Sequence, residues 1–203
     1  MGGVANRVAF MDHLPSSLVH VGILFSGNGS NMQNLIEQLH QKPFWRISNR
    51  QPLILNMALC ASNNPKAYGL VRCEKLGVPC VVVSSENELM QALVRCHVIL
   101  LAGYMKILSP LFIQHYPTLN IHPSFLPHHK GKDAIKKSFE SQEGMGVSVH
   151  WVTEELDGGP IILQESLTRE PNDTLESFTQ RVHALEHQLY PKALLKALGL
   201  RHA

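Results

Sequence analysis

Two side chains of the sequence could together stabilise a negative charge and move a proton. Asn120 and His122 stand two residues apart, directly before Pro123. On a β-strand such residues point to the same face, and a proline removes a ladder donor and ends the strand. The spacing therefore predicts an amide and an imidazole that project together at a strand end, where open α/β sheets bind their ligands.

The residue types indicate the chemistry of acyl transfer. An amide can donate a hydrogen bond to a developing oxyanion, and an imidazole exchanges a proton near neutral pH. Asp157 lies further along in a Gly-rich segment, Leu-Asp-Gly-Gly-Pro. If that loop folds back, its carboxylate would raise the pKa of His122. Asn120, His122 and Asp157 are thus the predicted catalytic residues, and they need no nucleophilic side chain.

A second segment could hold an anion. Residues 26–31 read Ser-Gly-Asn-Gly-Ser-Asn and separate an apolar run from a helical pattern. Free N–H groups at the start of a helix attract negative charge. No Gly-Lys-Ser/Thr follows, and Met32 stands where a dinucleotide fingerprint needs its third glycine. Two interpretations stay open: a site for one phosphate, and an ordinary tight strand-to-helix turn.

One segment has the residue order of a metal site but lacks the other features of one. Residues 183–187 read His-Ala-Leu-Glu-His, the His-x-x-Glu-His order of helical zinc hydrolases. No acidic third ligand follows His187, and with 12 histidines in the chain a chance match is easy. We therefore expect no zinc site here; a plain helix face and a Glu186 that faces a ligand both stay open, and the pair His128-His129 reads as a solvated loop.

The elements that must position these residues alternate along the chain. Strand patterns cover 19–25, 53–61, 78–83, 98–102 and 119–121, and helix patterns cover 31–41, 66–76 and 86–94. This alternation predicts an α/β fold with a mostly parallel sheet and helices on both faces. Two later strand patterns, 146–153 and 160–166, predict an antiparallel C-terminal edge. A helix over 174–198, capped by Thr174 and interrupted at Pro191, follows. Residues 42–52 read as a loop.

Composition bounds the class of protein. The 203 residues are 44% hydrophobic and 17% charged, as expected of one soluble globular core. We expect an N-terminal extension over 1–18 and a single domain over 19–203. The net charge of +2 argues against a nucleic-acid partner. Four cysteines without a CxxC pair indicate reduced thiols. No apolar run approaches the ~20 residues of a membrane span, and no signal peptide is evident, so we expect a cytoplasmic protein.

Four segments together resemble one enzyme family. Residues 26–31, 101–110, 120–127 and 156–160 are similar, in this order, to segments of the phosphoribosylglycinamide formyltransferases. The Asn-x-His pair and the Asp-Gly-Gly loop are shared by folate formyltransferases of this fold, whereas the Gly-Asn-Gly-Ser-Asn loop points to the phosphoribosylglycinamide branch. The resemblance covers roughly residues 19–198 and implies a Rossmann-like formyltransferase fold.

The resemblance also implies an activity and its residues. The family transfers a formyl group from 10-formyltetrahydrofolate to the amine of phosphoribosylglycinamide in purine biosynthesis, without a metal. Asn120 would bind the formyl oxygen, His122 would act as imidazolium and proton carrier, and Asp157 would support His122. The residues matching the substrate site are Gly29, Ser30, Asn31, His183 and Glu186. Those matching the folate site are Met105, Lys106, Ile107, Leu108, Asn120, Thr153, Glu154, Glu155, Leu156 and Asp157.

The chain also departs from the family pattern. The segment 83–98 is shorter than usual, without an evident counterpart of a folate-contacting arginine, and Lys106 replaces another arginine. Ile135 and Met145 stand where related enzymes often carry polar residues. The open alternatives are a sibling formyltransferase acting on methionyl-tRNA or a nucleotide sugar, a formyltetrahydrofolate hydrolase, and a non-catalytic folate- or nucleotide-binding homologue. The methionyl-tRNA enzyme is expected to carry an extra C-terminal domain, and the hydrolase an N-terminal regulatory domain. A monomer and a homodimer are both compatible with the sequence.

Overall fold

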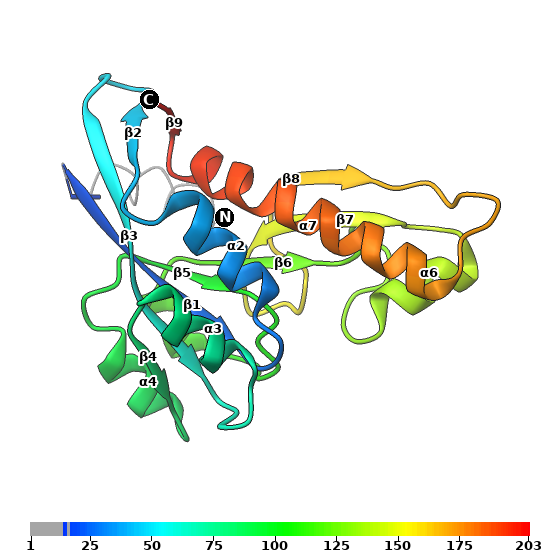
Figure 1. Ribbon diagram of the computed structural model, residues 1–203, viewed down its shortest axis with the longest axis horizontal. Helices are drawn as coiled ribbons and strands as arrows, with labels where there is room; N and C mark the ends of the chain where they lie inside the picture. The colour runs from blue at the N-terminus through cyan, green and yellow to red at the C-terminus, as the bar shows by residue number, and fades with distance from the viewer. Residues whose placement is uncertain (1–13, 16) are drawn as a thin grey trace.

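One mixed sheet forms the centre of the molecule (Figure 1). The computed structural model describes residues 14–15 and 17–203, so most of the predicted extension over 1–18 lies outside the described residues. The strands are β1 (Leu18–Phe25), β2 (Pro43–Arg46), β3 (Pro52–Ser62), β4 (Cys80–Val82), β5 (Val98–Leu101), β6 (Thr118–His122), β7 (Gly146–Trp151), β8 (Ile161–Ser166) and β9 (Leu200–His202). The helices are α2 (Ser30–Leu39), α3 (Gly69–Leu76), α4 (Glu86–Ala92), α5 (Pro110–His115), α6 (Ala134–Ser141) and α7 (Leu175–Ala197).

The strand order confirms the predicted fold class. The order is β8-β7-β6-β5-β1-β3-β2-β9, with β4 beside the second half of β3. Strands β6, β5, β1 and β3 run parallel, and β7 and β8 form the predicted antiparallel edge. A second antiparallel edge, made by β2 and β9, was not predicted. The ends of the predicted elements shift by at most three residues.

Helices cover both faces of the sheet because its central strands are apolar on both sides. All four residues of β5 are buried; Val98 and Leu100 join one core cluster, Ile99 and Leu101 the other. Side chains of a strand alternate between faces, so the two clusters lie on opposite sides. Helices α2, α3 and α7 contribute to the first cluster, and α4 and α5 to the second.

The predicted loop over residues 42–52 is wrong in part. Residues 43–46 form β2, which pairs antiparallel with both β3 and β9. Phe44 supplies the reason, because its side chain is buried in the core and anchors the short strand. The pairing with β9 links residues far apart in the sequence, which a local pattern does not reveal.

The predicted interruption at Pro191 is also wrong, because α7 runs unbroken through it. A proline inside a helix leaves the carbonyl four residues earlier without its N–H donor. Here that carbonyl belongs to His187, and the side-chain amide of Asn34 in α2 donates to it at 2.8 Å. The replacement satisfies the carbonyl and joins α2 to α7. The predicted N-cap Thr174 is confirmed, since it accepts from the N–H of Ser177.

Two short helices were not predicted. Ser109 caps α5 by accepting from the N–H of Phe112, and Pro110 occupies the first turn. Helix α6 follows Asp133, whose backbone is left-handed (φ 60°). Both helices have fewer than ten residues, so the apolar periodicity that identifies a helix is short in each.

The topology creates a crevice at one end of the sheet. β1 pairs with β3 on one side and β5 on the other, so the strand order reverses at β1. Open α/β sheets bind ligands beyond the carboxyl ends of the strands at this switch point. The loops after β1 and β5 meet there: Ser26 donates its N–H to the carbonyl of Gly103 at 3.0 Å. In the part of the chain that the structure describes, no helix is long and apolar enough to cross a membrane.

Candidate active site

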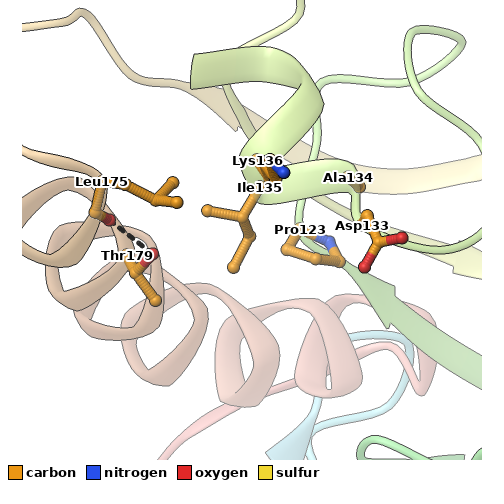
Figure 2. A pocket seen from close by; sticks show the side chains of 7 residues that line it. All are labelled: Pro123, Asp133, Ala134, Ile135, Lys136, Leu175 and Thr179. Atoms are coloured by element: carbon orange, nitrogen blue, oxygen red, sulfur yellow. Dashed lines mark hydrogen bonds between the residues drawn. The ribbon is translucent and has the colours of Figure 1, made fainter. Parts of the chain in front are cut away.

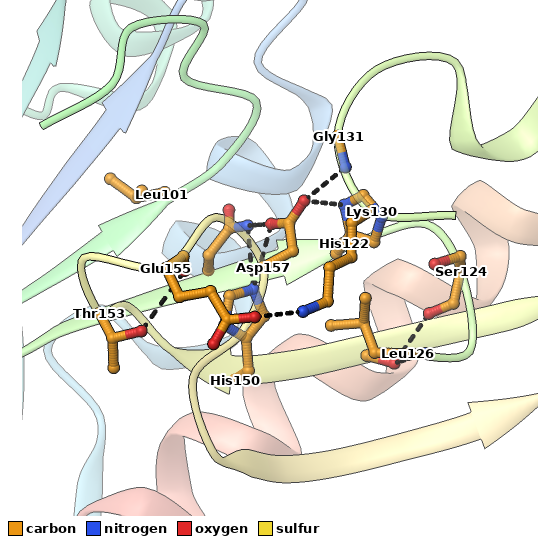
Figure 3. Close-up of polar contacts among 12 residues, drawn as sticks. Leu101, His122, Ser124, Leu126, Lys130, Gly131, His150, Thr153, Glu155 and Asp157 are labelled. Carbon is orange, nitrogen blue, oxygen red and sulfur yellow. Dashed lines mark hydrogen bonds and ion pairs between the residues drawn. The ribbon is translucent and has the colours of Figure 1, made fainter. Parts of the chain in front are cut away.

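The predicted catalytic residues lie together at the end of β6. Asn120 and His122 project from this strand, which ends before Pro123 as predicted. The Nδ2 of Asn120 donates to Oδ1 of Asp157 at 3.4 Å, and Nδ1 of His122 lies 3.4 Å from Oδ2 of the same carboxylate (Figure 3). His122 and Asp157 are both buried. The three side chains that the sequence separates therefore form one contiguous site.

Both ring nitrogens of His122 face acceptors. Its Nε2 donates to the carbonyl oxygen of His129 at 2.9 Å, and its Nδ1 faces the Asp157 carboxylate. A carbonyl and a carboxylate can only accept hydrogen bonds. Each ring nitrogen that carries a hydrogen therefore has an acceptor within reach.

The loop that carries Asp157 needs its glycines. A Cβ on Gly159 would lie 1.8 Å from the carbonyl oxygen of Trp151 at the end of β7, so only glycine allows this approach. Asp157 itself adopts a left-handed backbone (φ 48°), a conformation that aspartate tolerates better than most residues. Its Oδ2 also accepts from the N–H of Gly131 at 2.8 Å.

The surroundings keep Asp157 charged. Burial acts to raise the pKa of this carboxyl, but the hydrogen bond from His150, the Gly131 N–H and the charges of His122 and His150 outweigh it. The pKa of Asp157 is therefore held below its usual value. An anionic carboxylate beside His122 matches the supporting role predicted for it.

His150 is a site residue that the sequence reasoning missed. It lies on β7 directly opposite Asn120 in the antiparallel register. Its Nδ1 donates to the Trp151 carbonyl at 2.9 Å, and its Nε2 lies 3.2 Å from Nδ2 of Asn120. The same Nε2 lies 3.5 Å from Oδ1 of Asp157. The predicted antiparallel edge contained the signal, since a neighbouring strand must place some residue beside Asn120.

The glycine loop after β1 turns directly into α2. Gly29 adopts φ 76°, and a Cβ there would lie 2.7 Å from Cα of Gly69 in α3. No side chain in the described residues caps the N-terminus of α2. The first N–H groups of a helix have no intrahelical partners, so those of Ser30 and Asn31 are available to an anion.

The side chains of α7 that were matched to the substrate site meet this loop. Glu186 is buried and accepts from Nδ2 of Asn31 at 3.2 Å and lies 2.7 Å from Nδ1 of His183. The hydrogen bond to Glu186 raises the pKa of His183; burial opposes this and the Glu186 charge adds to it. Oδ1 of Asn31 is buried and has no hydrogen-bond partner among the described residues, as expected of an atom that awaits a ligand.

The segment matched to the folate site borders a cavity of about 160 Å³. Its lining includes Lys106, Ile107 and Leu108, with Asn63, Ser84, Ser85, Glu86 and Tyr104. Met105 and Ile107 are 70% and 87% exposed, and Leu156, in the loop before Asp157, is 58% exposed. Leu108, in contrast, is buried in the core. The N–H of Met105 donates to Oγ of Ser26 at 2.8 Å, which connects this segment to the glycine loop.

A second cavity lies apart from the predicted site residues. It measures about 290 Å³ and opens between α6, α7 and the start of the loop after β6 (Figure 2). Ile135, one of the departures from the family pattern, lines it together with Pro123, Asp133, Ala134, Lys136, Leu175 and Thr179. Met145, the other, packs against the main core cluster.

The zinc interpretation finds no support in the geometry. His183 turns toward Glu186, and within the described residues no group of three His, Cys, Asp or Glu side chains is arranged to hold a metal ion. The four cysteines are free thiols; Cys60, Cys73 and Cys96 are buried and Cys80 is partly buried.

Comparison with known proteins decides the family. Residues 19–194 match the family described as Formyl transferase. Phosphoribosylglycinamide formyltransferase of Bacillus subtilis is 35% identical over 194 residues, which cover 89% of this chain and 95% of the relative. The crystal structure of the enzyme from Campylobacter jejuni aligns with a TM-score of 0.80 and 38% identity, covering 90% of this chain and 98% of that one. This chain belongs to the phosphoribosylglycinamide formyltransferase family.

The family membership confirms the predicted resemblance and fold. It also extends to longer proteins: the trifunctional purine biosynthetic protein adenosine-3 of Chironomus tentans is 38% identical, but the match covers 13% of that relative's length. The chain thus corresponds to a part of such longer proteins.

Proposed function

We propose that this protein transfers the formyl group of 10-formyltetrahydrofolate to the primary amine of phosphoribosylglycinamide, a step of purine biosynthesis. The family membership supports the reaction, and its relatives carry this activity in their names. The amine nitrogen bonds to the formyl carbon, the bond from that carbon to the folate nitrogen breaks, and one proton passes from the amine to the folate nitrogen.

Three side chains carry the chemistry in this proposal. Asn120 donates from its amide to the formyl oxygen as that oxygen becomes negative; such donors are worth about 3–4 kcal/mol in other enzymes. His122, as imidazolium, stabilises the same oxyanion and assists the proton transfer. Asp157 holds the imidazolium with its charge. His150 positions the amide of Asn120 through their 3.2 Å contact.

The substrate side uses the glycine loop and α7. The N–H groups of Ser30 and Asn31, after the tight turn at Gly29, bind the phosphate at the N-terminus of α2. Glu186 and His183 bind the remainder of the ribonucleotide. The orphaned Oδ1 of Asn31 supports this arrangement, because a ligand hydroxyl would satisfy it.

The folate side uses the two exposed segments. Met105, Ile107 and Leu156 would cover the flat faces of the folate, and the backbone around Leu108 would bind its polar edge. Lys106 supplies a point charge for the anionic tail in place of an arginine fork. Residues of the loop before Asp157, Thr153, Glu154 and Glu155, would close the other wall. Glu155 already pairs with Lys130 at 2.6 Å.

The single observation that carries the proposal is the convergence on Asp157. Asn120, His122, Gly131 and His150 all contact its carboxylate, and none of them bears a hydroxyl or thiol nucleophile. The site therefore suits direct transfer between two bound substrates, in which an amine of the substrate attacks.

The experiment follows absorbance on loss of 10-formyltetrahydrofolate, with and without phosphoribosylglycinamide. The proposal expects turnover only when the ribonucleotide is present, with formyl-phosphoribosylglycinamide as product. Equal turnover in its absence would make the protein a formyltetrahydrofolate hydrolase. No turnover, with folate binding retained, would make it a non-catalytic homologue.

A further inference from the structure

Arg72 of α3 donates hydrogen bonds to the loop over residues 26–31. Its Nε donates to the carbonyl oxygen of Asn28 at 2.8 Å, and its Nη2 donates to Oδ1 of the same residue at 2.8 Å. Its Nη1 donates to Oε1 of Gln33 in the first turns of α2. The Cζ of its guanidinium lies over the ring of Tyr68, 5.0 Å from the ring centroid, which limits its freedom.

The same helix touches the loop at two further points. The N–H of Gly69 donates to the carbonyl of Gly27 at 3.1 Å, and Cα of Gly69 abuts Gly29. Gly69 is itself wedged against Phe25, since a Cβ there would lie 2.4 Å from the ring. These contacts hold the first turn of α3 directly against the end of β1.

These contacts bear on the direction of the free N–H groups of α2. Asn28 lies before the left-handed turn at Gly29, and Gln33 lies after it, so Arg72 joins the two sides of the turn. The N–H groups of Ser30 and Asn31 lie between these two anchors. If either anchor is released, the turn can rotate and the N–H groups no longer point together.

We propose that Arg72 is a positioning residue for the phosphate of the substrate, holding the loop over residues 26–31 in its phosphate-binding shape and adding positive charge beside it. The inference rests on the proposed function in taking this loop as the phosphate site. The guanidinium suits the task because its planar fork reaches two acceptors of one residue at once, which an ammonium group cannot do. Its charge also reaches the opposite helix: burial lowers the pKa of His187, the charges of Glu186 and Glu37 oppose this, and the positive charges of His183 and Arg72 lower the pKa further.

The test measures binding of ribose 5-phosphate by calorimetry, without the folate. Arg72→Gln removes both charge and fork and is expected to raise the dissociation constant about tenfold, since hydrogen bonds to charged groups have about this weight. Arg72→Lys keeps the charge but loses the fork, and it is expected to fall between wild type and Arg72→Gln. The matched control is Arg95→Gln, because Arg95 is exposed and makes no hydrogen bond or ion pair among the described residues. It is expected to bind within twofold of wild type.

Steady-state kinetics give the second readout. In Arg72→Gln the KM for phosphoribosylglycinamide should rise about tenfold, while the KM for the folate and kcat stay within about twofold. An unchanged dissociation constant in Arg72→Gln, or a wild-type protein that does not bind ribose 5-phosphate, would overturn the inference. A wild type that binds ribose 5-phosphate but transfers no formyl group would overturn the proposed function alone. Circular dichroism melts establish that each variant is folded.

Discussion

At the scale of single residues, Asp157 acts by charge rather than by size. Its carboxylate faces His122 and His150 and accepts from the N–H of Gly131. An asparagine there would keep the volume and one acceptor oxygen, but it would place an amide N–H₂ against donors. The ring of His122 would then lose the negative charge that lies beside it.

Asp157→Asn is therefore expected to lower kcat about 100-fold, the usual scale for losing acid–base support, while the protein stays folded. The measurement is kcat at saturating substrates together with a thermal melt. Glu140→Gln is the matched control, because Glu140 is exposed on α6 and only pairs with Lys136 at 3.8 Å; its kcat should not change. A kcat for Asp157→Asn within threefold of wild type would contradict the assigned role.

In the proposed function, His183 gives ribonucleotide binding a dependence on pH. Its pKa is raised by the hydrogen bond to Glu186, so it is protonated below that raised value and neutral above it. In the neutral form it no longer offers a positive charge to the phosphoribosyl group. Affinity for the ribonucleotide should thus decline as pH rises through this range.

His183→Lys tests this, because lysine keeps its charge to higher pH. The KM for phosphoribosylglycinamide should be similar in variant and wild type at pH 6 and lower in the variant at pH 9. The ratio of the two KM values cancels the titration of the substrate itself. A ratio that is constant between these pH values would refute the contribution of His183 charge.

At the scale of elements, a comparison of two glycines distinguishes the cost of a left-handed backbone from the cost of a steric clash. Gly29 (φ 76°) and Gly77 (φ 67°) are both left-handed, but only at Gly29 would an added Cβ lie within 2.7 Å of Cα of Gly69. Gly77→Ala should cost only the left-handed penalty, about 1 kcal/mol, and leave KM unchanged. Gly29→Ala should lose more free energy of unfolding and raise the KM for the ribonucleotide.

Urea denaturation and the two KM values check this pair. Equal losses in free energy of unfolding would mean that α3 yields to the added methyl group. An unchanged KM for the ribonucleotide in Gly29→Ala would show that the loop does not bind the phosphate.

The central strands and the main site were accessible from the sequence because their signals are local. Continuous apolar runs identify β1 and β5, and the Asn-x-His spacing with Pro123 identifies the end of β6. The resemblance supplied Asp157, His183 and Glu186 as members of the site. Their mutual contacts came only from the structure, as did the links to Asn31.

What the sequence did not reveal depends on contacts between distant segments. β2 and β9 exist because they pair with each other, and α7 continues through Pro191 because Asn34 of another helix satisfies the His187 carbonyl. His150 reaches Asn120 only through the strand register, and Arg72 reaches the loop over residues 26–31 only through the packing of α3. Such residues have no distinctive spacing of their own.

At the scale of the whole molecule, two half-buried histidines, His40 and His97, make the free energy of unfolding depend on pH. Burial lowers the pKa of His40, and burial followed by the charge of His20 lowers that of His97. Nδ1 of His97 accepts from the N–H of His20 at 2.9 Å, which a proton on that nitrogen would prevent. The unfolded chain takes up protons near pH 6.5, before the folded one does. Stability from these groups is thus present above pH 6.5 and is lost as pH falls below it. His183, with its raised pKa, contributes in the opposite direction.

The free energy of unfolding from urea titrations should consequently be smaller at pH 5 than at pH 7. His97→Asn should reduce this difference, because an asparagine oxygen can accept from the His20 N–H without titrating. The same difference in variant and wild type would show that His97 does not contribute to it.

The central claim is that the side chains at the end of β6 carry formyl transfer to the amine of phosphoribosylglycinamide. The most direct test is kcat of a folded His122→Ala protein with both substrates saturating. The account predicts a fall of at least about 100-fold with little change in the KM for the ribonucleotide. A kcat close to that of the wild type would contradict it.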